Sequence, residues 1–150
     1  MVFIARVMGL DVGDSRVGVA LSDPLGIMAT PLNIINRSDE RKAVERIAAI
    51  IREKEVAMVI VGLPLNMDGT RGTQAEKTDS FVADLKGSIS IPIEYRDERL
   101  STVNARELIQ GVRKTDRSTR YDAAAAALIL QGYLDEVAGP KELPPEPESD

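Results

Sequence analysis

The chain has 150 residues, with 19 basic and 24 acidic side chains, a net charge of −5, no cysteine and no histidine. It can therefore form no disulfide, no thiolate metal site and no histidine-dependent catalytic arrangement, so its chemistry has to use carboxylates, hydroxyls, Lys, Arg, Tyr or a bound ion. No apolar run approaches the roughly 20 residues of a membrane-spanning helix, and the apolar segment 1–5 is short and followed by Arg6, so we expect neither a signal peptide nor membrane association.

The first elements predict a β-hairpin that carries an acidic residue. Residues 6–10 form a strand candidate that ends at Asp11, Gly13 and Asp14 supply a turn, and apolar residues alternate with small ones over 17–22. Asp11 would then lie on rigid backbone at the rim of a sheet, where the neighbouring glycines let a ligand approach. Taken alone, an aspartate in this place is more often part of the turn than part of a site.

Strands and helices then alternate along the chain. The expected elements are an edge strand at 27–35 that contains Pro31, a helix at about 39–53, a buried strand at 56–63, a helix at 73–86, a strand at 90–96, a helix from Ser101 or Thr102 to about Gly111, and a helix at about 121–137. Thr73 and Glu76 fit a capping box for the second of these helices. This order predicts one α/β domain over residues 1–138, with a mixed five-stranded sheet flanked by helices. The last residues, 139–150, hold four acidic residues and four prolines and predict a disordered acidic tail.

Two adjacent carboxylates, Asp97 and Glu98, lie between a predicted strand and a predicted helix start. Strict alternation along the strand places them on opposite faces of the sheet, so only one of them can point into a site shared with Asp11. Alternation does not say which one, because strand ends often bulge. The plainer interpretation is that both are solvated loop residues or favour the positive end of the next helix.

A third acidic residue, Asp122, opens the last predicted helix. Positions 122, 126, 129 and 133 share one face of that helix, so Asp122 begins the stripe that carries Ala126 and Ile129 into the core. The alanines at 123–127 would let the helix lie close to the sheet and bring Asp122 towards the strand ends. The plainer interpretation is an ordinary acidic residue in a first helical turn.

Residues that could bind substrate surround these carboxylates in the sequence. The turn residues of 61–70 and the helix-start amides that follow could hold an anion such as a phosphate, and the basic segment 113–120 could bind backbone phosphates. Each is also compatible with a plain surface loop. The expected substrate contacts are Asn66, Thr70, Arg99, Ser101, Thr102, Arg113, Lys114 and Arg117.

The three carboxylates together indicate a metal site. Carboxylates at two strand ends and one helix start, in a chain without His or Cys, suit a hard ion with oxygen ligands, such as Mg²⁺ or Mn²⁺. Mg²⁺ is usually held by one or two carboxylates together with substrate phosphate oxygens, and two such ions can stabilise an in-line phosphoryl displacement. No side-chain nucleophile is then needed.

The motifs also resemble a known family. Four motifs follow one another along the chain: Gly9–Ala20, Val61–Thr70, Asp97–Thr102 and Asp122–Leu134. Over about residues 6–136 these motifs resemble the YqgF family, described both as Holliday junction resolvases and as pre-16S rRNA nucleases. Two features depart from the family pattern: Ala123 stands where relatives often have a basic or polar residue, and the acidic tail has no counterpart.

The resemblance implies a ribonuclease H-like fold, related to RuvC-type resolvases and retroviral integrases. It implies a metal-dependent hydrolase that trims the 5′ end of pre-16S rRNA in the cytoplasm, with nucleic acid and ribosomal particles as partners. It also implies that Asp11, Glu98 and Asp122 are the catalytic, metal-binding residues, and it alone favours Glu98 over Asp97.

Three alternatives stay open. The same carboxylates would serve a resolvase that cuts branched DNA, because RNA and DNA are distinguished by contacts to the 2′-hydroxyl. An actin-like or sugar-kinase-like ATPase shares a related hairpin, but it needs a second domain that 150 residues cannot hold. A non-catalytic binding module for ribosome or transcription machinery is the third alternative. The sequence leaves open whether the protein is a monomer or a homodimer.

Overall fold

The computed structural model describes residues 5–98 and 117–138, and the side chains of all of these except 117–122. The elements in chain order are β1 Arg6–Val12, β2 Arg16–Ser22, β3 Ala29–Asn36, α1 Glu40–Glu53, β4 Val56–Leu63, α2 Thr73–Lys86, β5 Ile93–Asp97 and α4 Arg117–Val137. The predicted helix between Ser101 and Gly111, the predicted contacts at 99–114 and the predicted tail at 139–150 lie outside the described residues. No helix in the described ranges has the length and apolarity to cross a membrane.

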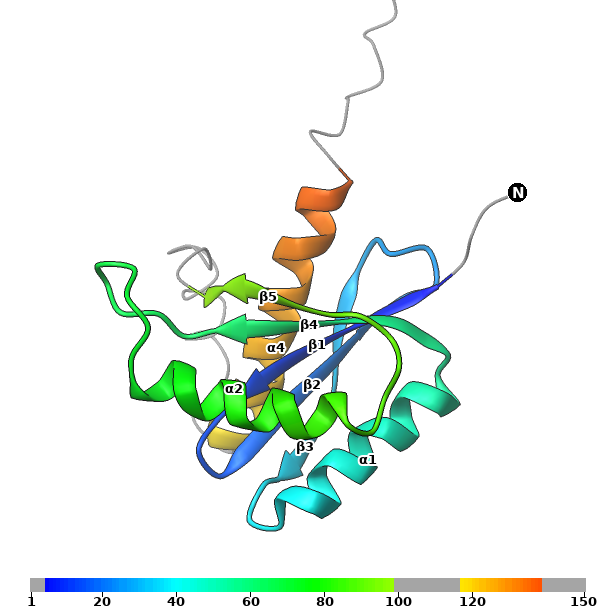
Figure 1. Ribbon diagram of the computed structural model, residues 1–150. Helices are drawn as coiled ribbons and strands as arrows, with labels where there is room; N and C mark the ends of the chain where they lie inside the picture. The colour runs from blue at the N-terminus through cyan, green and yellow to red at the C-terminus, as the bar shows by residue number, and fades with distance from the viewer. Residues whose placement is uncertain (1–4, 99–116, 139–150) are drawn as a thin grey trace, which may run out of the picture.

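The five strands form one mixed sheet in the order β3-β2-β1-β4-β5 (Figure 1). The first three strands are antiparallel, and β4 and β5 run parallel to β1. The predicted mixed five-stranded α/β sheet is therefore confirmed, including an edge position for the strand that contains Pro31. Because β1, β4 and β5 are parallel, their carboxyl ends meet at the same edge of the sheet.

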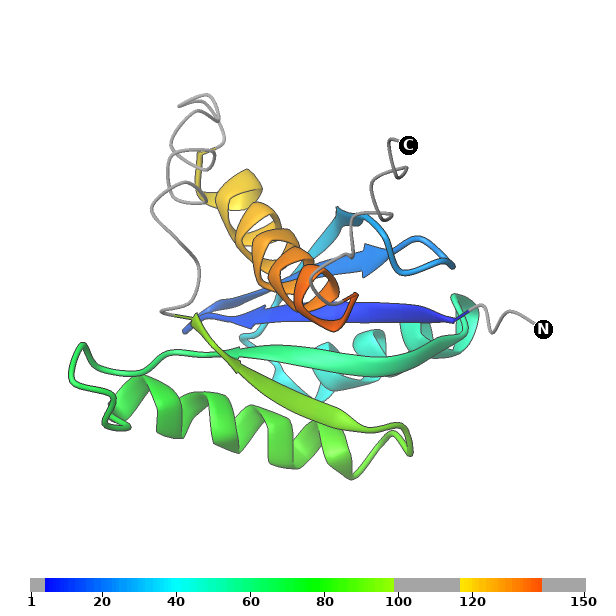
Figure 2. The same cartoon turned by 90° about the horizontal axis from the view of Figure 1, so that it is seen from above.

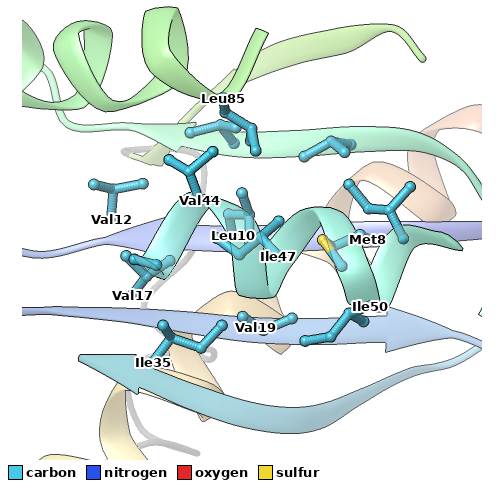
Figure 3. Packing of buried hydrophobic residues seen from close by; sticks show 14 of the residues in the cluster. Met8, Leu10, Val12, Val17, Val19, Ile35, Val44, Ile47, Ile50 and Leu85 are labelled. Carbon is cyan, nitrogen blue, oxygen red and sulfur yellow. The ribbon is translucent and has the colours of Figure 1, made fainter. Parts of the chain in front are cut away.

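Helices cover the two faces of the sheet unequally (Figures 1 and 2). α1 and α2 lie on one face, and α4 crosses the other. Met8 and Leu10 of β1 are fully buried in the larger core, where they meet Ile47 of α1 (Figure 3). The small residues that alternate with the apolar ones in β2, such as Ala20, face α4 instead. β2 thus sends its large side chains to the α1–α2 layer and its small ones to α4, whereas β4 also packs a large side chain, Ile60, towards α4.

α4 lies close to the sheet because small residues line the contact. A Cβ atom on Gly9 of β1 would lie 2.7 Å from Leu130 Cβ and 2.9 Å from the Ala126 carbonyl oxygen. Ala126 itself is fully buried. The prediction that the alanines let this helix sit close to the sheet is confirmed.

The N-cap of α2 and the starts of α4 and β5 differ from the prediction. Thr73 does not cap α2, because the N-cap is Gly72, which has no side chain to accept a hydrogen bond and packs its backbone against Asn66. α4 begins at Arg117 rather than near 121, since nothing in the polar segment before Asp122 breaks a helix. β5 begins at Ile93, directly after Pro92, rather than at Ser90.

The Gly9 contact gives the first prediction. Gly9→Ala should destabilise the protein by about 1–3 kcal/mol, because the new methyl group must push α4 away from β1. The control is Gly87→Ala: Gly87 has ordinary helical dihedrals, and its added Cβ would meet only the Asp84 carbonyl oxygen, at 3.4 Å. Urea unfolding of both variants measures the difference. Equal, small losses in the two variants would contradict the close packing of α4.

Candidate active site

Two carboxyl groups that are 87 positions apart in the sequence meet at the carboxyl edge of the sheet. Asp11 is the second-last residue of β1, and Glu98 follows the last residue of β5. Their side chains are hydrogen-bonded to each other. The structure therefore brings Asp11 together with one member of the Asp97–Glu98 pair.

Alternation along the two strands explains why Glu98 is that member. Val7 and Gly9 face α4, so Asp11 shares their side of β1. Arg96 of β5 also faces α4, where it forms an ion pair of 2.6 Å with Glu136. Glu98 comes two residues after Arg96, so alternation places it on the same face as Arg96 and Asp11.

Asp97 belongs to the other face of the sheet. The Tyr95 hydroxyl, two residues earlier, donates a hydrogen bond to Asp79 of α2. By alternation Asp97 lies on the α2 side of β5, away from the face that Asp11 shares with Glu98.

Gly62 of β4, which lies between β1 and β5, makes room for the carboxyl pair. A Cβ atom at this position would lie 2.9 Å from Glu98 Cγ, 3.0 Å from Glu98 Oε2 and 2.5 Å from Ile129 Cδ1 of α4. The site therefore needs a residue without a side chain here, both to admit Glu98 and to admit α4.

The electrostatics of the pair favour a bound proton or a bound cation. Burial raises the pKa of Glu98, the neighbouring negative charge of Asp97 raises it further, and the hydrogen bond with Asp11 only partly opposes these effects. Two carboxyl groups can form a hydrogen bond to each other only when one of them carries a proton. A divalent cation would take the place of that proton, and the donors are all oxygen atoms, as Mg²⁺ and Mn²⁺ require.

The third predicted ligand, Asp122, lies in α4 one turn before Ala126. α4 runs antiparallel to β1, because Leu134 lies beside Val7 and Ala126 lies against Gly9. Extending the helix back by one turn carries the backbone of Asp122 towards the end of β1 that holds Asp11, although its side chain is outside the described part. Among the described side chains, no three potential ligands lie close enough together to hold a metal ion.

In the loop at 61–70, which was expected to hold a phosphate, polar side chains hydrogen-bond to one another. The Asn66 side-chain amide donates to Thr70 Oγ1 at 2.9 Å, and the Thr70 hydroxyl donates to Asp68 Oδ1 at 2.6 Å. The two expected substrate contacts are therefore engaged with each other, next to an acidic side chain that would repel a phosphate.

Sequence reasoning missed a brace behind Asp11 that is centred on Arg37. This guanidinium donates to the carbonyl oxygens of Gly13 at 2.8 Å and Lys77 at 3.1 Å, pairs with Glu40, and lies 5.1 Å from the centre of the Phe81 ring. It ties the turn after Asp11 to both α1 and α2. No local pattern marks Arg37, because its partners come from three separate segments: the turn after β1, α1 and α2.

A second brace holds the strand that leads to Glu98. Asp79 of α2 accepts hydrogen bonds from both Arg71 and Tyr95, and these two contacts hold the pKa of its carboxyl below the usual range. Arg71 also lies 6.0 Å from the centre of the Tyr95 ring. α2 thus anchors β5 as well as the hairpin turn, and no sequence pattern indicated this second role.

Curated proteins of similar sequence share a single name. The chain is 52% identical over 132 residues to a protein of Desulforamulus reducens, covering 87% of this chain and 96% of that one. It is 50% identical over 133 residues to a protein of Thermoanaerobacter pseudethanolicus, with the same shares covered. Both relatives are named "Putative pre-16S rRNA nuclease".

Solved structures share the fold at low sequence identity. RuvC of Thermus thermophilus superposes with a TM-score of 0.55 at 16% identity, covering 87% of this chain and 96% of that one. The fowlpox virus resolvase, solved with Holliday junction DNA, gives 0.54 at 11% identity, covering 88% and 98%. The predicted ribonuclease H-like fold is therefore confirmed.

A family model settles the relationship. The model described as "RuvX: Holliday junction resolvase" matches residues 5–136, which is almost the range over which the motifs resemble the YqgF family. The chain belongs to this RuvX (YqgF) family.

Proposed function

We propose that this protein is a metal-dependent nuclease that hydrolyses phosphodiester bonds and acts in maturation of the 5′ end of pre-16S rRNA. The observation that carries the proposal is the meeting of Asp11 and Glu98, two carboxyl groups from different strands, over the glycine of a third. The names of relatives about 50% identical support the choice of RNA.

Asp11 and Glu98 would hold the cation, with Asp122 as a third ligand. When bound, a divalent cation supplies positive charge at the scissile phosphate and activates water. The protein's part is to keep two ionised carboxylates at a fixed separation, which the braces at Arg37 and Asp79 support. In this proposal the basic residues Arg113, Lys114 and Arg117 bind neighbouring phosphates, and Arg99, Ser101 and Thr102 follow the site along the chain.

A second candidate substrate is branched DNA. The description of the matched family, "Holliday junction resolvase", is the observation that favours it. The carboxylate chemistry would be the same, so only a direct comparison of substrates separates the two.

Cleavage by single variants tests the proposal. Asp11→Asn, Glu98→Gln and Asp122→Asn should each lower cleavage at least about 100-fold, because a lost ligand disturbs the in-line geometry. Asp97→Asn, which changes the adjacent residue on the other face, should keep much more activity. Labelled pre-16S RNA and a four-way DNA junction, each with and without Mg²⁺ or Mn²⁺, provide the assay.

Glu94→Gln is the matched control, since Glu94 is an exposed residue of the same strand. Near-normal cleavage by Asp11→Asn or Asp122→Asn would refute the metal-site assignment, whereas no cleavage by the wild type on either substrate would favour a non-catalytic binding module. Loss of activity in Asp97→Asn but not in Glu98→Gln would exchange the roles of those neighbours.

The raised pKa of Glu98 predicts how metal-free stability depends on pH. The folded protein favours the protonated Glu98 carboxyl. The stabilisation of the fold by this protonation is therefore complete below the ordinary glutamate pKa, and it is lost as the pH rises through the raised pKa of Glu98 in the folded protein. Metal-free Glu98→Gln should therefore match the wild type in acid and be as stable or more stable at pH 7.

Thermal melting with a chelator at several pH values measures this difference, and added Mg²⁺ should then raise the melting temperature of the wild type more than that of Glu98→Gln. A Glu98→Gln variant that is clearly less stable than the wild type at neutral pH would argue that the ionised carboxylate stabilises the fold by itself.

A further inference from the structure

A groove runs along α1 beside the outer edge of β3, on the face of the sheet opposite α4. It consists of two adjoining cavities of about 430 and 440 Å³ that share Asn33 and Arg46 in their linings. We call it the α1 groove. Its hydrogen-bonding and basic side chains are Asn33, Asn36, Ser38, Lys42, Arg46 and Lys54.

The cations that line the α1 groove form no salt bridge with another described residue. On the same helix Arg41 pairs with Glu45 at 3.5 Å, whereas Lys42 and Arg46, one turn apart, form no ion pair within the described part of the chain. Of the acidic residues in the lining, Asp39 caps α1 by accepting from the Lys42 backbone N–H at 3.2 Å. The other, Glu53, lies at the far end. Three cations and two acids give a local excess of one positive charge in a chain of net charge −5.

The edge strand beside the groove is unsuited to pairing with a peptide. Pro31 has no N–H to offer, and the Ile34 N–H already donates to Asn33 Oδ1 at 2.8 Å. Strand addition depends on such main-chain donors, so this edge is protected against it. Among the described residues, no aromatic side chain lines the groove, so these residues offer bases nothing to stack on. Amide, hydroxyl and cationic groups remain, and these are the groups that bind backbone phosphates.

One end of the groove, lined by Asn36, lies at the edge of the sheet that holds the carboxyl pair. In the sheet register, Asp11 of β1 lies opposite Gly18 of β2. Two residues earlier in β2, Arg16 lies opposite Asn36 of β3, which lines the groove. β1 and β3 are two strand spacings apart, about 10 Å. A nucleic acid strand that passes Asp11 can therefore round the β1–β2 turn and continue along α1.

We propose that the α1 groove binds the sugar–phosphate backbone of the substrate strand, to one side of the phosphate that is cut and without regard to sequence. The proposal rests on the nuclease function proposed above. It makes Lys42 and Arg46 the main contacts of a second binding region, which only a sufficiently long strand can reach.

Binding of RNA strands of two lengths tests the groove. Fluorescence anisotropy would follow single-stranded RNA of 6 and 20 nucleotides on the full chain carrying Asp11→Asn, which prevents cleavage. Adding Lys42→Gln with Arg46→Gln should raise the Kd of the 20-mer about tenfold at low salt. It should also flatten the slope of log K against log salt by about 1.4, the value for two lost phosphate contacts on a single strand. The 6-mer should bind as before.

The control is Arg41→Gln with Arg52→Gln, which removes the same charge from the same helix at residues that do not line the groove. Equal weakening by both double variants would mean that only overall charge matters and would overturn the proposal. So would an unchanged Kd in the groove variant, or displacement of the 20-mer by a glutamate-rich peptide of equal charge. Circular dichroism establishes that each variant is folded.

The two proposals can fail separately. If the wild type cleaves RNA but the Lys42–Arg46 variant binds the 20-mer normally, the groove proposal is wrong and the nuclease proposal stands. If the wild type cleaves no nucleic acid while 20-mer binding depends on Lys42 and Arg46, the nuclease proposal is wrong, and the groove binds a nucleic acid backbone but not beside a phosphate that is cut.

Discussion

The contact between the Asp11 and Glu98 carboxyl groups can form only if the strands and the helix around it are arranged in one way. It requires that β1 and β5 end at one edge of the sheet with a strand between them, and that this strand has a glycine, Gly62, beneath Glu98. It also requires a helix on that face which lies close enough to the sheet to limit the access of solvent to the carboxyl pair. Gly9 and Ala126 allow this close approach because both are small. Two acids held together in this way raise the free energy of the metal-free fold, so the remaining packing has to offset that repulsion.

The opposite layer supplies the rigidity. α1 and α2 hold the strand ends from behind through Arg37, Asp79 and Tyr95, whose contacts reach the hairpin turn and β5 without entering the carboxylate face. The larger apolar core and the braces at Arg37 and Asp79 share one face, and the carboxyl pair lies on the other, beside the smaller apolar cluster under α4. A metal site gains from this arrangement, because ligands positioned by packed elements do not have to be ordered when the cation binds.

Much of this could be predicted from local patterns. Period-2 alternation in β2, the buried run of β4 and the order of the elements were enough for the mixed sheet, since each reflects burial of a strand on one or both faces. Alternation also placed Asp97 and Glu98 on opposite faces. It could not choose between them, because the choice depends on which face α4 covers, and α4 is some twenty residues further along the chain.

Features built from distant segments were not predictable. Arg37 has partners near residues 13, 40, 77 and 81, and no window of sequence contains them all. The capping box at Thr73 was wrong because the preceding loop, packed against Gly72, fixes where α2 begins. The α1 groove had no sequence signal, since its polar residues come from a strand edge and a helix face that only the fold brings side by side.

A carbon-13 NMR titration of the Glu98 carboxyl group observes the site without depending on a chosen substrate. In metal-free protein we expect a midpoint above the ordinary glutamate range, lowered when Mg²⁺ is added and unaffected by Mg²⁺ in the Asp11→Asn variant. An ordinary midpoint that Mg²⁺ does not move would contradict the claim that Asp11 and Glu98 form one cation-binding pair.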